Sequence, residues 1–179
     1  MKKLTTIVLI VLSVCLVFGL CACSKQTIED KLEFIQSVSN AKKVTKTVVM
    51  TDAGMEVYSS VRIAVIGDTV TVQSTVKQLG DGMKMEESVN NTTSTKEAET
   101  TKPLNLSIDN IAIYEMDDTT LDATILQQNV ATVLGIEGFE PAGDMSAVCT
   151  FENKNLVKVE CRFTTTGNRS VVVTYVYEY

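Results

Sequence analysis

The chain has 179 residues and a formal net charge of −6, with 22 Asp and Glu against 16 Lys and Arg. This acidic balance argues against nucleic-acid binding, which depends on contacts of Lys and Arg with phosphate, and against electrostatic docking to anionic lipid. The sequence contains no histidine, so a Ser-His-Asp or Cys-His nucleophilic site cannot be built from it, and the commonest metal ligand is missing.

The N-terminal segment has the three-part layout of a secretory signal. Two lysines follow the first methionine, residues 4–20 are uncharged, and small residues lead to a cysteine. The ending Leu20-Cys21-Ala22-Cys23 resembles the lipobox of bacterial lipoproteins. This resemblance implies cleavage between Ala22 and Cys23. It also implies a diacylglyceryl group on Cys23, the new N-terminus, with fatty-acyl chains such as palmitate.

Two other interpretations of this segment remain open, a signal-anchor helix that is retained and a secretory signal that is cleaved elsewhere. The apolar run is short for a membrane-spanning helix, which needs about 20 residues. We therefore expect residues 1–22 to be a cleaved signal peptide and residues 23–179 to be a single extracytoplasmic domain. Acyl chains would hold it at the cell membrane, because each buried methylene contributes about 0.8 kcal/mol and two chains give stable anchoring.

Residues 24–42 have the period of an amphipathic helix. The apolar residues recur at spacings of four, three and three, at Ile28, Leu32, Ile35 and Val38. The charged residues, Lys31 among them, fall outside this stripe. We expect this helix to lie on a sheet.

The period then changes to two, which predicts strands at residues 44–51, 55–66, 69–79 and 83–90. Turn sequences rich in Gly and Asp separate them. A two-residue turn at Gly67-Asp68 would pair Val65 with Val70 and place both on one apolar face. A four-residue loop before that strand pair would set Met50 opposite Met55 on the same face. These turns together predict an antiparallel meander.

Residues 91–102 read NTTSTKEAETTK and contain no large apolar residue, which predicts a flexible, solvated loop. Beyond it, residues 104–108 alternate in the manner of a strand. Ile111 begins a stretch of opposite parity, which predicts a β-bulge near Asp109-Asn110.

Residues 119–134 return to a helical period, with Thr119-Thr120-Leu121-Asp122 as a capping box and Gly135 as the C-terminal cap. Asp117 and Asp118 suit the positive end of that helix dipole. Three further strands are expected at residues 144–152, 156–166 and 169–179.

The order of elements predicts an α+β fold. We expect a curved antiparallel sheet of about eight strands with two amphipathic helices on its apolar face. In architecture and order of elements, the mature domain resembles the half-barrel lipoproteins of the LolA and LppX type. This resemblance assigns no site residue.

Two cysteines, Cys149 and Cys161, remain outside the signal, in a compartment that can be oxidising. Their strands can be paired so that the two residues lie opposite each other, with a three-residue loop between the strands. This register predicts a cross-strand disulfide bond, which would stabilise the fold by roughly 3 kcal/mol. The alternative is two buried free thiols that pack as small hydrophobic side chains.

Two functions are compatible with these features. The first is a non-enzymatic, lipid-anchored cell-envelope lipoprotein that binds an apolar or amphiphilic ligand between sheet and helices. Inward-facing methionines would line its cavity or pack in the core, namely Met50, Met55, Met83, Met85 and Met145. The second is a structural or interaction module that engages an envelope partner through its outer sheet face. On that face Lys158, Glu160 and Arg162 would lie opposite Val173, Tyr175 and Tyr177. We expect no enzyme activity, catalytic residue, metal site or cofactor, and the sequence identifies no protein partner.

Overall fold

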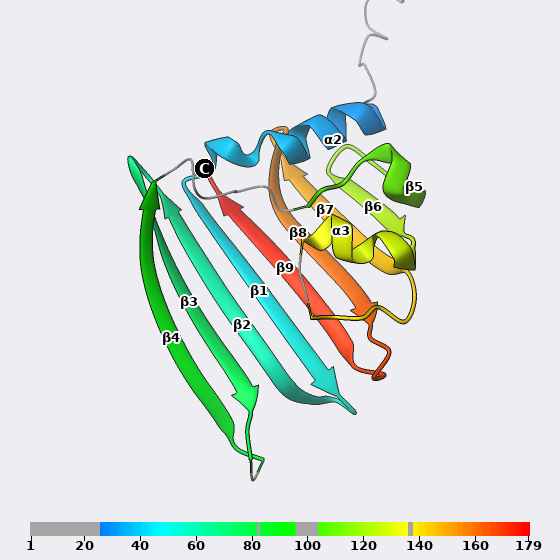
Figure 1. Cartoon of the computed structure of the whole chain (residues 1–179). Coiled ribbons are helices and arrows are strands. Elements are labelled where there is room, and N and C mark those ends of the chain that lie inside the picture. Colours follow the sequence, from blue (N-terminus) through cyan, green and yellow to red (C-terminus); the bar gives the residue numbers. More distant parts are fainter. Residues whose placement is uncertain (1–25, 82, 96–103, 136–137) are drawn as a thin grey trace, which may run out of the picture.

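Nine antiparallel strands form one open, curved sheet in the computed structural model, which describes residues 26–81, 83–95, 104–135 and 138–179 (Figure 1). The strands in chain order are β1 (Lys43–Asp52), β2 (Met55–Ile66), β3 (Thr69–Leu79), β4 (Met85–Thr95), β5 (Ile111–Met116), β6 (Thr120–Ile125), β7 (Met145–Glu152), β8 (Asn155–Thr164) and β9 (Ser170–Glu178). Their order in the sheet is β4-β3-β2-β1-β9-β8-β7-β6-β5. Two meanders, β1 to β4 and β5 to β9, therefore meet where β1 pairs with β9.

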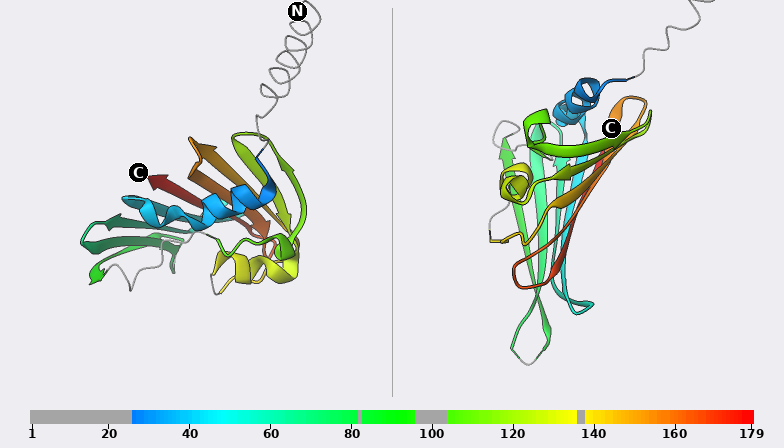
Figure 2. Two further views of the ribbon diagram at one scale, coloured as in Figure 1. Left: turned by 90° about the horizontal axis from the view of Figure 1, so that it is seen from above. Right: turned by 90° about the vertical axis from the view of Figure 1, so that its right-hand side faces the viewer.

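Short helices lie on the concave side of this sheet (Figures 1 and 2). They are α2 (Ile28–Gln36), η1 (Val38–Asn40), η3 (Ile108–Asn110), η4 (Gln127–Asn129) and α3 (Val130–Leu134). Helix α2 begins at a capping box, in which the side chains of Thr27 and Asp30 each accept a hydrogen bond from the other residue's backbone N–H. Within the described ranges, none of the helices combines the length and the apolar character needed to cross a membrane.

The predicted class is confirmed in its coarse form, a curved antiparallel sheet with helices on one face. The described part of the sheet has nine strands rather than about eight. The helix predicted over residues 24–42 ends as an α-helix at Gln36 and is followed by the single turn η1, after which the chain enters β1. Most of the second predicted helix, at residues 119–134, is not helical.

Residues 119–134 are not one helix. Residues 120–125 form β6, and only the five residues of α3 are α-helical, ended by Gly135 in the left-handed conformation with φ 56°. The cap was therefore predicted correctly and the helix was not. In β6 the buried apolar residues alternate with polar ones, and β-branched Thr and Ile favour extended backbone. The buried residues of this strand are Leu121, Ala123 and Ile125.

Asp117 shapes the β5–β6 turn instead of capping a helix. Its Oδ1 accepts hydrogen bonds from the backbone N–H groups of Thr119 and Thr120, both at 2.7 Å. These donors, with Thr119 first, lower the pKa of Asp117 to about 2. The carboxylate thus fixes the turn that the sequence pattern had assigned to a helix start.

The β2–β3 hairpin differs from the predicted register by one residue. Ile66 pairs with Val70, and Ala64 pairs with Val72, so three residues rather than two separate the paired ends. A slip of one residue moves every side chain of a strand to the opposite face. Val65, which the predicted register placed inside, is 51% exposed, whereas Ala64 is 2% exposed.

The β1–β2 hairpin also differs from the prediction. Its turn is the two-residue Ala53-Gly54, with φ of 48° and 84°, the left-handed values typical of tight hairpins. A register shift follows between Met50 and Thr51, so Met50 pairs with Tyr58 rather than with Met55. The shorter turn and the bulge together set the face that β2 presents to the core.

Strand β4 continues as far as Thr95, so residues 91–95 of the predicted flexible loop are strand. The rest of that loop, residues 96–102, lies outside the described residues. The predicted signal peptide, residues 1–22, and Cys23 also lie outside them.

Residues 104–107 are irregular and Ile108 begins η3, so the predicted strand at residues 104–108 is absent. The backbone N–H of Asn105 donates to the carbonyl oxygen of Val133 at 2.8 Å, which ties this segment to α3. The predicted bulge exists but lies further along the chain, between Ile111 and Ile113.

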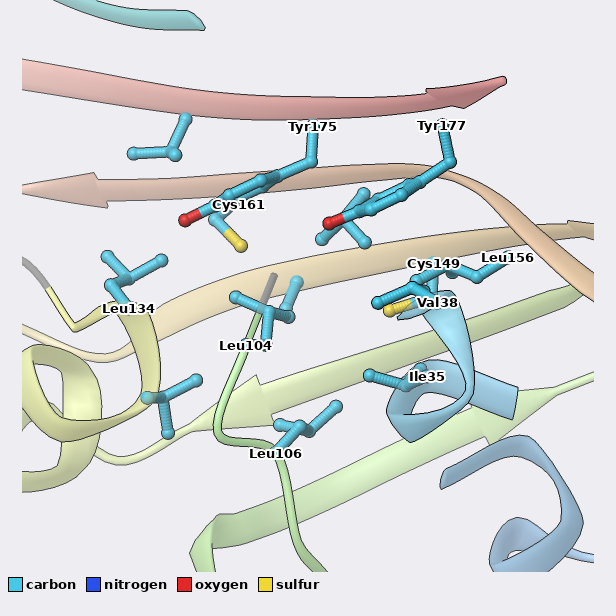
Figure 3. Close-up of a cluster of buried hydrophobic side chains, with 14 of the residues drawn as sticks. Ile35, Val38, Leu104, Leu106, Leu134, Cys149, Leu156, Cys161, Tyr175 and Tyr177 are labelled. Carbon is cyan, nitrogen blue, oxygen red and sulfur yellow. The ribbon is translucent and has the colours of Figure 1, made fainter. Parts of the chain in front are cut away.

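The core lies between these covering segments and the β6–β9 part of the sheet (Figure 3). Every second residue of β7 and β9 is buried, as expected for strands with one covered face. The covering segments contribute Ile35, Val38, Leu104, Leu106, Val130 and Leu134. The β1–β4 part of the concave face is covered less completely, and it leads to the candidate site.

Candidate functional site

A groove is lined by residues of β1, β2, β3, the segment after α3 and the β8–β9 turn. These segments lie at the end of the sheet opposite α2 (Figure 1). We name this groove the end groove and define it by its lining residues, Met50, Asp52, Val57, Tyr58, Gln78, Leu79, Gly138, Phe139 and Arg169. Its volume is about 590 Å³, within the range of small-molecule sites. A second hollow of about 420 Å³ shares Met50, Gly138, Phe139 and Arg169 and extends toward the β8–β9 turn.

Phe139 forms the aromatic centre of the end groove. Its ring centroid lies 6.3 Å from that of Tyr58 and 6.4 Å from that of Phe163, with interplanar angles of 70° and 85°. These are edge-to-face arrangements, which aromatic pairs prefer. Gly138, with φ of 86°, gives the chain the turn that precedes Phe139. The segment after α3 thus places one aromatic ring between β2 and β8.

The rim of the end groove is charged. Arg169 Nε lies 3.1 Å from Asp52 Oδ2, and this pair links the β8–β9 turn to the end of β1. Both side chains are about half exposed, so the ion pair contributes only about 0.2–1 kcal/mol to stability. The backbone N–H of Thr166 donates to the carbonyl oxygen of Glu140 at 2.8 Å, which holds the neighbouring segment in place. A lining that combines apolar side chains with polar and charged ones suits an amphiphilic ligand.

Two cations lie further along the same concave face. Lys46 on β1 and Arg62 on β2 are directly opposite each other, and Lys46 has buried Val44 and Val48 on either side along its face. The ammonium of Lys46 lies 5.2 Å from the ring centroid of Tyr175. Burial lowers the pKa of Lys46, and the neighbouring Arg62 lowers it further. Burial also lowers the pKa of Arg62.

Lys31 is a third inward cation, and its role is structural. It is 0% exposed, its Nζ donates to the carbonyl oxygen of Asp118 at 2.9 Å, and it lies 4.4 Å from the ring centroid of Phe151. Burial lowers the pKa of Lys31, while the carboxylates of Asp117 and Asp118 act in the opposite direction. This side chain fastens α2 to the β5–β6 turn, although the sequence pattern placed it outside the apolar stripe.

The five methionines predicted to line one cavity are not brought together. Met50 is half-buried and borders the end groove, and Met145 is fully buried in the core on β7. Met55, Met83 and Met85 are exposed at the ends of hairpins. The prediction failed for these three because it depended on hairpin registers that the structure does not have.

The predicted disulfide between Cys149 and Cys161 is absent, and both residues are free, buried thiols. Cys149 pairs with Val159 and Cys161 pairs with Ala147, because the β7–β8 turn is the two-residue Asn153-Lys154. The cysteines therefore share a face but are not opposite each other. Burial raises the pKa of Cys149 to about 12 and raises that of Cys161 as well. The structure therefore agrees with the alternative interpretation, in which the two free thiols pack as small hydrophobic side chains.

The outer sheet face also differs from the prediction. Tyr175 and Tyr177 are buried on the inner face, opposite Lys46 and Val44 of β1. On the outer face of β8 the Glu160 carboxylate forms ion pairs with Lys158, at 3.0 Å, and with Arg162, at 2.5 Å. This arrangement lowers the pKa of Glu160 through hydrogen bonds from Lys158 and Arg162. The aromatic part of the predicted partner surface is therefore missing.

Sequence reasoning missed most residues of the site. Phe139 could have been noticed as an aromatic residue in a turn segment, one residue after a glycine and two before Pro141. Lys46 could have been noticed as a charged residue with the inward parity of Val48. No group of three or more Asp, Glu or Cys residues that could hold a metal ion occurs among the residues the structure describes.

Comparison with protein-family models finds no match, and comparison with curated proteins finds none either. Kievitone hydratase from Nectria haematococca is structurally similar at 12% identity and a TM-score of 0.30, over 88% of this chain and 53% of that chain. The dehydratase domain of the CurK module of curacin polyketide synthase is similar at 8% identity and a TM-score of 0.25, over 82% of this chain and 78% of that chain. This chain thus spans about half the length of the hydratase.

These neighbours are enzymes, and they contradict the prediction that this chain is not an enzyme. That prediction is therefore withdrawn. The TM-scores of 0.30 and below carry no reaction, substrate or catalytic residue over to this chain.

Proposed function

We propose that this chain is a cell-envelope lipoprotein whose acyl chains on Cys23 anchor it to the outer side of the cell membrane. We further propose that its end groove binds an apolar or amphiphilic ligand. The observation that carries ligand binding is the edge-to-face pair of Phe139 and Tyr58 beside an open hollow of about 590 Å³. The anchoring is supported by the lipobox resemblance of Leu20-Cys21-Ala22-Cys23.

The chemistry of the end groove favours such a ligand. Met50, Leu79 and Phe139 offer apolar surface at an open face, and covering it contributes about 25 cal/mol for each Å² removed from water. The Asp52–Arg169 pair at the rim can orient a polar group. A domain held on a membrane also meets its lipids at a high effective concentration, so modest affinity suffices.

Photolabelling tests the ligand-binding part of this proposal. The full-length protein in nanodiscs is irradiated with a fatty alcohol that has a diazirine at the end of its chain, and labelled peptides are mapped by mass spectrometry. We expect label on the segments around Tyr58 and Phe139. Phe139→Ala removes the central ring and should lower the yield severalfold.

Tyr114→Ala is the matched control, because it removes an exposed aromatic ring from the edge strand β5, and it should leave the yield unchanged. A thermal unfolding curve for each variant separates lost binding from lost folding. Label that spreads evenly over the surface, or that Phe139→Ala does not reduce, would contradict a ligand site in the end groove.

Cysteine replacement tests the anchoring. Cys23→Ser removes the only thiol that the lipobox resemblance assigns to the acyl group, so the protein should leave the membrane fraction and escape labelling by a palmitate analogue. Cys21→Ser is the matched control, two residues away, and should still be labelled and sediment with membranes. Membrane fractionation that is the same for both variants would exclude Cys23 as the anchor.

A further inference from the structure

The end groove and the second hollow beside it differ in their lining. The end groove takes apolar side chains from three strands, Met50 on β1, Val57 on β2 and Leu79 on β3. Apart from Met50 and Phe139, the second hollow is lined by glycines, threonines and two charged residues. Four residues border both hollows, so one ligand can place an apolar part in the first and a polar part in the second.

The two charged residues of the second hollow are Glu140 and Arg169, and they do not form an ion pair with each other. Arg169 uses its Nε for Asp52, and its terminal amino groups form no hydrogen bond with the residues that the structure describes. The Glu140 carboxylate accepts a hydrogen bond from the Thr166 hydroxyl at 3.3 Å. Among the described residues, no basic side chain lies within ion-pair distance of Glu140. One donor group and one acceptor group of opposite charge therefore remain available to a ligand.

These charges discriminate among the head groups that an amphiphile can carry. A purely anionic head group at Arg169 would also face the carboxylates of Asp52 and Glu140, and like charges at a binding site oppose association. A purely cationic head group would pair with Glu140 but leave the donors of Arg169 without an acceptor. An uncharged hydroxyl would form weaker hydrogen bonds than a charged group. A head group that carries an anion beside an ammonium pairs with both residues.

We infer that the second hollow binds the zwitterionic head group of a single-chain amphiphile, with a phosphate at Arg169 and an ammonium at Glu140. The planar guanidinium suits phosphate, because its N–H groups match two phosphate oxygens at once. The single chain lies in the end groove against Met50, Leu79 and Phe139. This inference rests on the proposed ligand-binding function of the end groove and names the chemical class of its ligand.

The experiment compares three photoreactive probes of equal chain length on the full-length protein. They are a phosphoethanolamine ester, a phosphate monoester and the fatty alcohol. The nanodiscs consist of phosphatidylglycerol, so that the bilayer supplies no zwitterion. We expect the phosphoethanolamine ester to label the segments around Tyr58 and Phe139 at concentrations about three- to fivefold lower than either other probe, the ratio that a partly exposed ion pair supports.

Substitutions of Glu140 test the ammonium contact. Glu140→Gln should remove the preference for the phosphoethanolamine ester over the phosphate monoester. Glu140→Lys should reverse it, a gain that a misfolded protein cannot produce. Glu115→Gln is the matched control, because it removes the same charge from an exposed position on β5, which lines neither hollow. It should leave the preference intact, and thermal unfolding verifies that each variant is folded.

The outcomes separate this inference from the proposed function. Equal labelling by the phosphoethanolamine ester and the phosphate monoester, or equal effects of Glu140→Gln and Glu115→Gln, overturns the inference and leaves the end groove as an apolar site. Failure of all three probes to label the groove overturns the proposed function as well. If free phosphoethanolamine competes as effectively as its unlabelled long-chain ester, the site binds the head group alone and the amphiphile is excluded.

Discussion

Replacing Lys31 with glutamate is expected to destabilise the fold by at least about 3 kcal/mol, because it buries a carboxylate without a counter-charge. The native ammonium donates to the carbonyl oxygen of Asp118 and lies over the ring face of Phe151. A carboxylate there would face the negative face of the ring and the nearby carboxylate of Asp117. Urea unfolding followed by circular dichroism measures the loss.

Lys31→Met separates the charge from the packing. Methionine keeps most of the unbranched stem and removes the ammonium, and Asp118 is exposed, so its carbonyl can bind water instead. We expect Lys31→Met to change the free energy of unfolding by no more than about 1 kcal/mol, because apolar replacements of buried ions are often neutral. A loss for Lys31→Met as large as that for Lys31→Glu would contradict this expectation, because it would mean that the contacts of the ammonium with the Asp118 carbonyl and the Phe151 ring stabilise the fold.

Strand positions were predictable from the sequence where the period of two and the turn residues agree. Strands β2 and β3 were predicted at residues 55–66 and 69–79, and these are the bounds observed. The bounds of β7 to β9 were predicted to within two residues. The position of such a strand can be predicted locally, because the alternation of apolar residues and the turn-forming residues both involve only residues close together in the sequence.

Strand β6 shows the limit of predicting secondary structure from the local pattern of apolar residues. The sequence from Thr119 to Leu134 places apolar residues at spacings that fit a helix, yet its first half also alternates with period two. Pairing with β5 and β7 satisfies the backbone of that half and selects the strand. The choice depends on neighbours that are distant in sequence, so tertiary context overrides the local period.

The candidate site could be predicted only in part for the same reason. Of its residues, Met50 alone was proposed from sequence as a ligand contact. Asp52 and Arg169 are more than a hundred residues apart and meet because β1 pairs with β9. Phe139 reaches the groove from a third segment, which follows α3. Nothing in the local pattern specifies that the two meanders pair through β1 and β9. The sequence therefore did not show that the residues of the end groove come together at this junction.

The register of the β2–β3 hairpin was ambiguous because β2 carries apolar residues on both faces. Val61, Ile63 and Val65 have one parity, and Ala64 and Ile66 have the other. Either register therefore brings apolar residues opposite Val70 and Val72 of β3. In the structure the smaller set is inside, beneath the end of the helical layer, and the larger set faces outward. Burial by a distant segment decides between two locally equivalent alternatives.

The same aspartate at two neighbouring positions of β2 distinguishes these registers. Ala64 is 2% exposed and pairs with buried Val44 and Val72, so Ala64→Asp should cost at least about 3 kcal/mol or prevent folding. Val65 is 51% exposed, so Val65→Asp should cost no more than about 1 kcal/mol, the range of strand propensities.

The urea midpoints of unfolding of the two variants are compared. They convert to free energies of unfolding if the dependence of that free energy on urea concentration is the same for both variants. The two-residue turn at Gly67-Asp68 requires the reverse order, because it places Val65 inside and Ala64 outside. A larger loss for Val65→Asp would therefore restore that register.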